Sequence, residues 1–244
     1  MRRLMLLLTV CVGYAVSMAA AASGPVQLAV SDLQTSAGKL AKLHGGVTYG
    51  ARLFPLALRF VPPDGSWTGS QWRSGRLPSE QAERLGIKDE GGPPHFGWVG
   101  IARGGTSKIV DPRGIIVIMT AYARTPSLAA TVKGLLTRGH GAIYEPTTSV
   151  RIAGFAGAQF DGKRILTAPN HVFVPFSPIS HGGGAFPSKL DALSIVGSVF
   201  RVIVLNVRGK TVVMFIDSVA LSADEFPAFL TRADRILKSL RFSA

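Results

Sequence analysis

The chain has 244 residues, and its 27 Lys and Arg outnumber 14 Asp and Glu, which gives a formal net charge of +13 at pH 7. After the N-terminus the basic residues are scattered, with no run longer than Lys163-Arg164, whereas nucleic-acid binders cluster cations beside stacking aromatic residues. Nucleic acid is therefore excluded as the expected partner, and the charge indicates at most a weak contact with anionic surfaces.

Residues 1–22 have the pattern of a secretory signal peptide. Arg2 and Arg3 precede an apolar run that ends in a series of alanines. Cys11 is the single cysteine, and Val10 before it departs from the small residue that precedes a lipidated cysteine. We expect cleavage near residue 22 and an extracytoplasmic mature chain, secreted or associated with the cell envelope, without disulfides or thiol catalysis. No later segment is apolar over the ~20 residues that a membrane span needs.

The remaining sequence predicts a short arm followed by one domain. The arm, residues 23–46, carries a weak helix over Ser31 to Gly46, because its leucines recur at helical spacing. Residues 47–244 form a single α/β domain. This domain opens with a strand in "TYGARLFPLALRF", which Pro62-Pro63 terminates.

A Gly- and Pro-rich stretch, residues 64–94, follows the first strand. Within it we expect a short strand near Gln71 to Arg76 and a helical turn around Ser79 to Leu85. Regular structure returns with strands in "HFGWVGIARG" and "GIIVIMTAY". The second is apolar at every position from Ile115 to Met119, which predicts a central strand buried on both faces.

A helix follows, with Thr125 as its cap, Pro126 at its first position and Gly139 near its end. Further strands are expected in "VRIAGFAGAQFDGKRIL", where Asp161-Gly162 is a hairpin-turn signal, and over His171 to Ser177.

The last part of the chain gives the clearest pattern. It predicts a hairpin from Val199 to Asp217, turning at Val207 to Lys210, with large apolar residues on both faces. The closing segment "ADEFPAFLTRADRILKSLRF" has an apolar helical stripe. Pro227 is tolerated there if Ala223 or Asp224 is the cap.

The segment "VRIAGFAGAQFDG", the hairpin after Val199 and the closing helix together resemble the PsbP-like fold over roughly Val47 to Phe242. That group includes photosystem II extrinsic proteins, nuclear-transport factors that bind a small GTPase, and the LpqN-like lipoproteins of mycobacteria. The resemblance implies an α/β (α+β) fold with a central, mainly antiparallel sheet and helices packed on its faces. It also implies a binding module, and it transfers no functional residue.

Catalytic motifs are incomplete in this chain. His181 to Gly184 read HGGG, as in the oxyanion loops of esterases, but no G-x-S-x-G nucleophile elbow occurs. Gly209-Lys210-Thr211 ends like a phosphate loop but lies in the expected hairpin turn. No two histidines are four residues apart, so we expect neither a metal nor a cofactor. Asp217, closing an apolar strand, is the carboxylate expected to be partly buried, where it could have a shifted pKa or pair with Arg201 on the neighbouring strand. A structural ion pair or an exposed strand end is favoured there over a catalytic role.

One group of residues could mark a ligand site, because aromatic faces beside cations suit carbohydrate, aromatic or anionic ligands. Its members are Trp67, Trp72, Arg73, His95 and Trp98. Alternatively, the tryptophans attach the long loop to the core. The function we expect is a non-catalytic binding or interaction module of a bacterial cell envelope, whose partner is a protein or an envelope polymer. The alternative is a secreted serine-type hydrolase or esterase with an unrecognised nucleophile.

Overall fold

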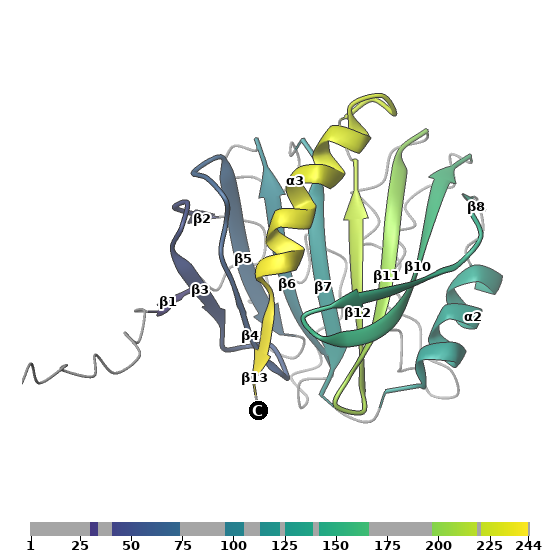
Figure 1. Ribbon diagram of the computed structural model, residues 1–244, viewed down its shortest axis with the longest axis horizontal. Helices are drawn as coiled ribbons and strands as arrows, with labels where there is room; N and C mark the ends of the chain where they lie inside the picture. The colour runs from purple at the N-terminus through teal and green to yellow at the C-terminus, as the bar shows by residue number, and fades with distance from the viewer. Residues whose placement is uncertain are drawn as a thin grey trace, which may run out of the picture.

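The computed structural model describes residues 30–33, 41–73, 96–104, 113–122, 125–138, 142–165, 197–218 and 221–243. These residues form two β-sheets and two helices, α2 (Leu128–Arg138) and α3 (Phe226–Ser239) (Figure 1). The smaller sheet contains β1 (Val30–Asp32), β3 (Thr48–Ala51), β4 (Ala57–Phe60) and β13 (Arg241–Ser243). The larger sheet contains β2 (Ala41–Lys42), β5 (Trp67–Arg73), β6 (Phe96–Arg103), β7 (Ile115–Ala121), β8 (Ala142–Tyr144), β9 (Thr148–Ile152), β10 (Phe155–Arg164), β11 (Val199–Val207) and β12 (Lys210–Asp217). Neither described helix is long and apolar enough to cross a membrane.

The larger sheet is antiparallel throughout. Its strand order is β2-β5-β6-β7-β12-β11-β10-β8, and β9 pairs with the same strand, β10, as β8 does. The predicted α+β class, mostly antiparallel sheet with two helices, is confirmed.

Strand β7 lies in the middle of this sheet, and every one of its residues is buried. Ile116 and Ile118 belong to one hydrophobic core, whereas Ile115, Val117 and Met119 belong to a second. Successive side chains of a strand point to opposite faces, so a strand that is apolar at every position contributes to a core on each side. The prediction of a central strand buried on both faces is confirmed.

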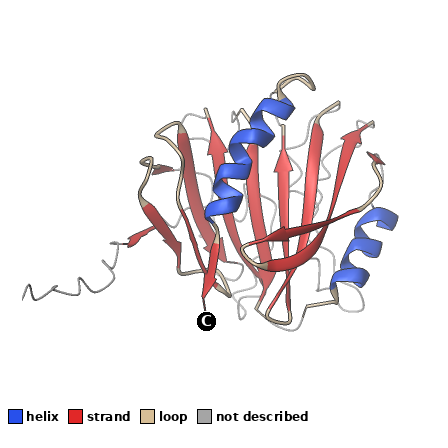
Figure 2. Ribbon diagram, viewed as in Figure 1, coloured by secondary structure: helices blue, strands red, loops and turns tan. Residues whose placement is uncertain are grey.

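Helix α3 lies across the front of the larger sheet (Figure 2). Its buried side chains share the first core with residues of both sheets. Phe229 is 2% exposed, and its ring centroid lies 6.0 Å from that of Trp67 on β5. The predicted apolar stripe of this helix is therefore confirmed as a core-facing stripe.

The ends of α3 differ from the prediction. The cap is Glu225, whose carboxylate accepts a hydrogen bond from the Ser222 backbone N–H at 3.0 Å. After Leu240 the chain becomes strand β13, which pairs with β4 and buries Phe242. We expected the helical segment to continue to Phe242. The chain forms a strand there instead, because the free edge of β4 offers hydrogen-bond partners to its backbone.

Helix α2 contributes Leu135 to the second core, with Leu128, Val132 and Leu136 packed around it. Ser127 caps it, since its Oγ accepts a hydrogen bond from the Ala130 N–H at 3.2 Å. The predicted cap, Thr125, instead accepts a hydrogen bond from the Thr211 N–H of β12 at 2.8 Å, so the helix begins two residues later than expected.

Two tight turns set the hairpins of the second half. In the turn between β11 and β12, Arg208 and Gly209 have φ of 54° and 81°. In the turn between β9 and β10, Ala153 and Gly154 have φ of 51° and 85°. Two successive residues with positive φ define the type I′ turn that matches the twist of a hairpin. The first turn was predicted and the second was not.

The turn predicted at Asp161-Gly162 does not form. Both residues lie inside β10, opposite Arg201 and Phe200 of β11. A Cβ on residue 162 would collide with the Phe200 ring, so glycine is needed there for close approach, not for a turn.

The N-terminal half contains three further corrections. The single strand expected in "TYGARLFPLALRF" is a hairpin, in which β3 and β4 are separated by residues 52–56. The strand expected near Gln71 begins earlier, at Trp67. The helix expected over Ser31 to Gly46 is absent at both described ends, where β1 and β2 form instead, while residues 34–40 lie outside the described residues. Backbone pairing with β3 and β5 outweighs the weak helical periodicity.

The expected helical turn at Ser79 to Leu85, the strand over His171 to Ser177 and the HGGG segment also lie outside the described residues.

Candidate functional site

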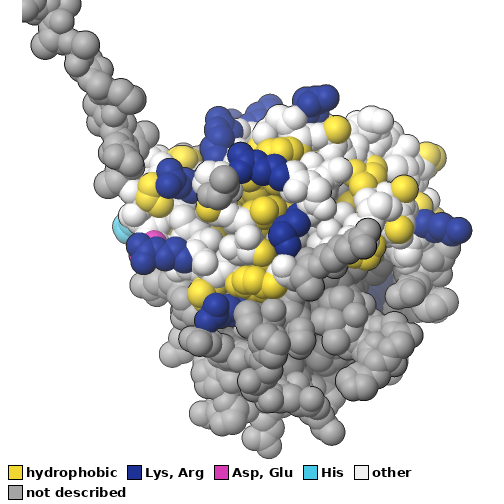
Figure 3. All heavy atoms as spheres, turned by 90° about the horizontal axis from the view of Figure 1, so that it is seen from below, with side chains coloured by type: hydrophobic (Ala, Val, Ile, Leu, Met, Phe, Trp, Pro, Cys, Tyr) yellow, Lys and Arg dark blue, Asp and Glu magenta, His cyan; other side chains and the backbone are white. Residues whose placement is uncertain are grey.

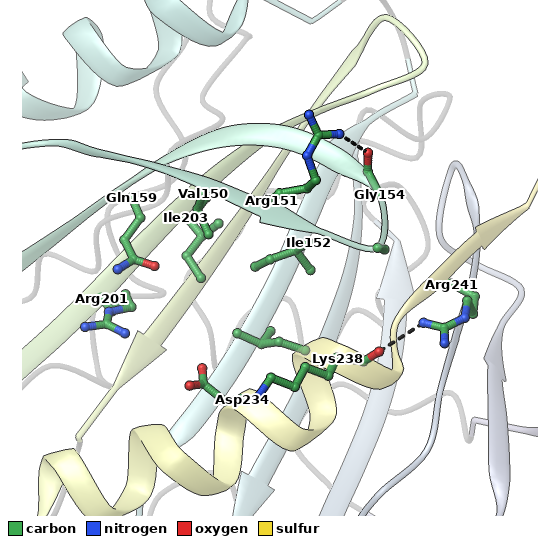
Figure 4. A pocket seen from close by; sticks show the side chains of 12 residues that line it. Val150, Arg151, Ile152, Gly154, Gln159, Arg201, Ile203, Asp234, Lys238 and Arg241 are labelled. Carbon is green, nitrogen blue, oxygen red and sulfur yellow. Dashed lines mark hydrogen bonds between the residues drawn. The ribbon is translucent and has the colours of Figure 1, made fainter.

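A groove of about 670 Å³ lies between the β9–β10 hairpin and helix α3, above the face of β11 (Figure 4). This volume falls within the range of about 300–1,000 Å³ typical of small-molecule sites. We call it the hairpin–helix groove. It is lined by Val150, Arg151, Ile152, Ala153, Gly154, Gln159, Arg201, Ile203, Asp234, Leu237, Lys238 and Arg241.

The inner surface of the groove is apolar. Ile203 from β11 and Leu237 from α3 are buried members of the first core, and Val150 and Ile152 from β9 pack against that core. Each of these side chains is placed by periodicity: β9 directs every second residue inward, and α3 presents Leu237 on its apolar stripe. A ligand that covers these side chains would remove apolar surface from water.

The tip of the hairpin is fastened to the smaller sheet. The ring of Phe155 meets the ring of Phe242 on β13 edge to face, with centroids 5.9 Å apart. Arg151 also donates a hydrogen bond from Nη1 to the Gly154 carbonyl at 2.8 Å, across the turn. These contacts hold β9 over the sheet face, and the groove is the space left between this strand and α3.

The rim of the groove is cationic, with Arg151, Arg201, Lys238 and Arg241 against the single carboxylate Asp234. Arg201 is held by a bidentate pair with Asp161, in which Nε and Nη2 donate to the two carboxylate oxygens at 2.7 and 2.8 Å. This hydrogen bonding raises the pKa of Arg201 above its usual value, so the guanidinium remains charged. Its Nη1 is not used in the pair and can donate to another acceptor.

Of the two remaining cations, Lys238 lies in the last turn of α3 and Arg241 is the first residue of β13. Arg241 donates from Nη1 to the carbonyls of Lys238 at 3.0 Å and Leu240 at 2.7 Å. No hydrogen bond or ion pair holds the Lys238 ammonium among the described residues. Figure 4 shows its side chain running along the helix toward Asp234. Lys238 is therefore free to meet an anion.

The end of the molecule seen in Figure 3 agrees with this charge distribution. Dark blue Lys and Arg side chains are spread among yellow apolar ones over the described surface, and little magenta is visible. The described surface on this face therefore carries more basic than acidic side chains, as the net charge of the sequence predicts.

Of the five residues predicted as a ligand site, the described side chains Trp67, Arg73 and Trp98 do not line this groove. Trp67 is completely buried in the first core, and Trp98 is 5% exposed in the second, on the opposite face of the larger sheet. Trp72 and Arg73 lie at the end of β5, paired with the start of β6. His95 lies outside the described residues. Trp67 and Trp98 are therefore core residues, in agreement with the alternative interpretation that the tryptophans pack into the core. A ligand-binding role for the five residues remains a prediction.

The pairing predicted between Asp217 and Arg201 is wrong. Arg201 pairs with Asp161 on its other neighbour strand, and its side chain points to the face of the first core. Asp217 is completely buried at the end of β12, in register with Phe200 and Ile115 of the second core. Two side chains on adjacent strands can form an ion pair only if they point to the same face of the sheet, and Arg201 and Asp217 point to opposite faces.

The groove residues could not be predicted as a set from the sequence, because they come from five separate elements: β9, β10, β11, α3 and β13. One signal was available: Val150 and Ile152 alternate with Arg151 beside a Gly turn, which is the pattern of an edge hairpin with one apolar face. Nothing in the sequence places this hairpin next to the last turn of α3.

The described residues contain no group of three or more His, Cys, Asp or Glu side chains that could hold a metal ion. Gly209-Lys210-Thr211 belongs to the hairpin of β11 and β12, as expected. Burial raises the pKa of Tyr144 to about 12, but this phenol packs edge to face on Phe160 and Phe200 in the second core, away from the groove.

No family model matches the chain. A comparison with curated proteins finds no match. Among solved structures, the chain is similar to cyanobacterial PsbP (CyanoP) from Synechocystis sp. PCC 6803, with a TM-score of 0.40 and 8% sequence identity over 85% of this chain and 95% of that chain. This is a distant resemblance of fold, which carries no argument about function, and the LpqN-like relationship remains a prediction.

Proposed function

We propose that this chain is an exported, non-catalytic binding module of a bacterial cell envelope, and that the hairpin–helix groove is its binding site. The observation that supports this function is the combination of an apolar inner surface with four cations and one carboxylate at the rim of one groove. Such a site suits a partner that is both apolar and anionic.

The two parts of the groove have different roles. Burial of apolar surface supplies most binding free energy, at roughly 25 cal/mol per Å². The cations select for negative charge and speed association rather than adding much affinity. Because Arg201 is already fixed by Asp161, it presents its remaining donor without a further loss of side-chain freedom.

An anionic apolar fluorophore, anilinonaphthalene sulfonate, tests the site. Lys238→Gln and Arg151→Gln should each weaken its binding by about fivefold, or about 1 kcal/mol, since each removes one cation from the rim. The matched control is Arg235→Gln, because Arg235 is an exposed cation on the same helix that does not line the groove. Equal losses in all three variants would show that only the overall charge matters and would contradict the proposed site.

Export has its own test. Production of the full chain in a bacterial host should yield a protein outside the cytoplasm whose intact mass corresponds to a chain beginning at Ser23, because the expected cleavage follows residue 22. A variant with Leu6→Arg and Leu7→Arg interrupts the apolar run and should stay in the cytoplasm at full length. Recovery of the unaltered chain at full length in the cytoplasm would contradict export.

A further inference from the structure

Strand β9 has a free edge beside the groove. Among the described residues it pairs with β10 alone, in the register Ile152 with Phe155, Val150 with Gly157, and Thr148 with Gln159. The two-residue turn makes Ile152 and Phe155 a hydrogen-bonded pair, and such pairs alternate along an antiparallel ladder.

The alternation assigns the backbone groups of β9 to two sides. Thr148, Val150 and Ile152 direct their N–H and C=O groups to β10. Ser149 and Arg151 direct theirs away from it, and no backbone hydrogen bond to another described element engages either residue. Two donors and two acceptors therefore face outward along the edge that borders the groove.

The space beyond this edge is the hairpin–helix groove. The groove is bounded by β9 on one side and by Asp234, Leu237 and Lys238 of α3 on the other. From β9 itself, Val150, Arg151 and Ile152 line the groove, and three residues of extended chain span roughly 10 Å. We propose that the groove binds an extended acidic segment of a partner protein, which pairs with the free edge of β9 as an added strand; this inference rests on the proposed function.

The chemistry of the lining specifies the segment. In an added strand, every second residue would point inward, to the same side as Val150 and Ile152. These inward residues would cover Ile203 and Leu237, so they should be apolar. Alternate residues would point with Arg151, directly across the strand pair, and should be acidic. The partner segment is therefore an alternation of apolar and acidic residues.

The lining also favours a peptide over a sugar. None of the described residues that line the groove is aromatic. Among these described residues, Gln159 has the only uncharged polar side chain, whereas a bound saccharide needs stacking faces and many polar partners. A peptide strand instead uses the backbone groups of Ser149 and Arg151, which this edge supplies.

The test uses three blocked seven-residue peptides of alternating Glu and Val: one unmodified, one N-methylated at every Glu and one N-methylated at every Val. All three have the same charge and side chains. In an antiparallel added strand the N–H groups of the Glu residues face β9, so methylation at Glu should weaken binding at least tenfold and methylation at Val should change it much less. A parallel strand would reverse the two results.

Amide hydrogen exchange locates the contact. Binding of the unmodified peptide should slow exchange at the Ser149 and Arg151 amides, and Lys238→Gln should weaken this binding whereas Arg235→Gln should not. Equal affinity of all three peptides, equal loss from both methylations, or no peptide binding would overturn the added strand. If the added strand is overturned but anilinonaphthalene sulfonate still binds in a charge-dependent way, the groove remains a site for anions. If neither the peptides nor anilinonaphthalene sulfonate binds, the proposed function is overturned as well.

Discussion

Replacing Phe229 by Ala should lower the free energy of unfolding by about 3–5 kcal/mol. Phe229 is 2% exposed and lies in the first core between α3 and the larger sheet. Its ring is 6.0 Å from Trp67 and 6.4 Å from Phe226, and it lies against Gly114, where a Cβ would come within 2.7 Å of it. The cavity left by alanine could not be refilled without moving α3, which forms one wall of the groove.

Urea denaturation followed by intrinsic fluorescence measures this effect, with the midpoint expected to fall and the slope to stay constant. The matched control is Ile143→Ala, because Ile143 is also a large apolar residue but is 59% exposed. Its substitution should cost less than about 1 kcal/mol. Similar costs for the two variants would contradict the position of α3 on the sheet.

Replacing Gly157 by Ala should destabilise the protein by about 1–3 kcal/mol and weaken binding in the groove. Gly157 lies opposite Leu205 in the antiparallel pairing of β10 with β11. An added Cβ would collide with the Val204 carbonyl and the Leu205 side chain. Backbone atoms of a central strand cannot move aside. The hairpin that carries β9 would have to shift instead, and the groove would change shape.

The control is another Gly→Ala substitution, at Gly134 in the middle of α2, where an added Cβ meets nothing within 4 Å. Alanine costs less than glycine in a helix interior, so this variant should be more stable by about 0.5–1 kcal/mol. Thermal unfolding of both variants, with anilinonaphthalene sulfonate binding as a second measurement, checks the opposite signs. Unchanged stability and binding for Gly157→Ala would contradict the close packing of β10 on β11.

Local patterns predicted the parts of the fold in which one periodicity dominates. The run from Ile115 to Met119 was apolar at every position, which is sufficient to identify a strand buried on both faces. The hairpin after Val199 and the apolar stripe of α3 were equally clear, because each apolar pattern extends over eight or more residues. The mostly antiparallel α+β class follows from these elements.

Prediction failed where two segments distant in sequence compete for the same backbone. Arg241 and Phe242 belong to the segment predicted as helical yet form part of β13, because β4 lies beside them only in the folded chain. A turn was predicted at Asp161-Gly162 and forms instead at Ala153-Gly154, although both dipeptides end in glycine. Their roles differ because close packing with Phe200, and not a turn, requires glycine at position 162.

The sequence by itself determined the cationic surplus, the central apolar strands and the core-facing stripe of the last helix, since these depend on residue type and on spacing along one element. Only the tertiary structure decided which charges meet. It joined Arg201 to Asp161 instead of Asp217, brought Lys238 and Arg151 to one groove, and left the outer edge of β9 without a strand partner among the described residues. A groove between separate elements is a property of their packing, and no period within a single element encodes it.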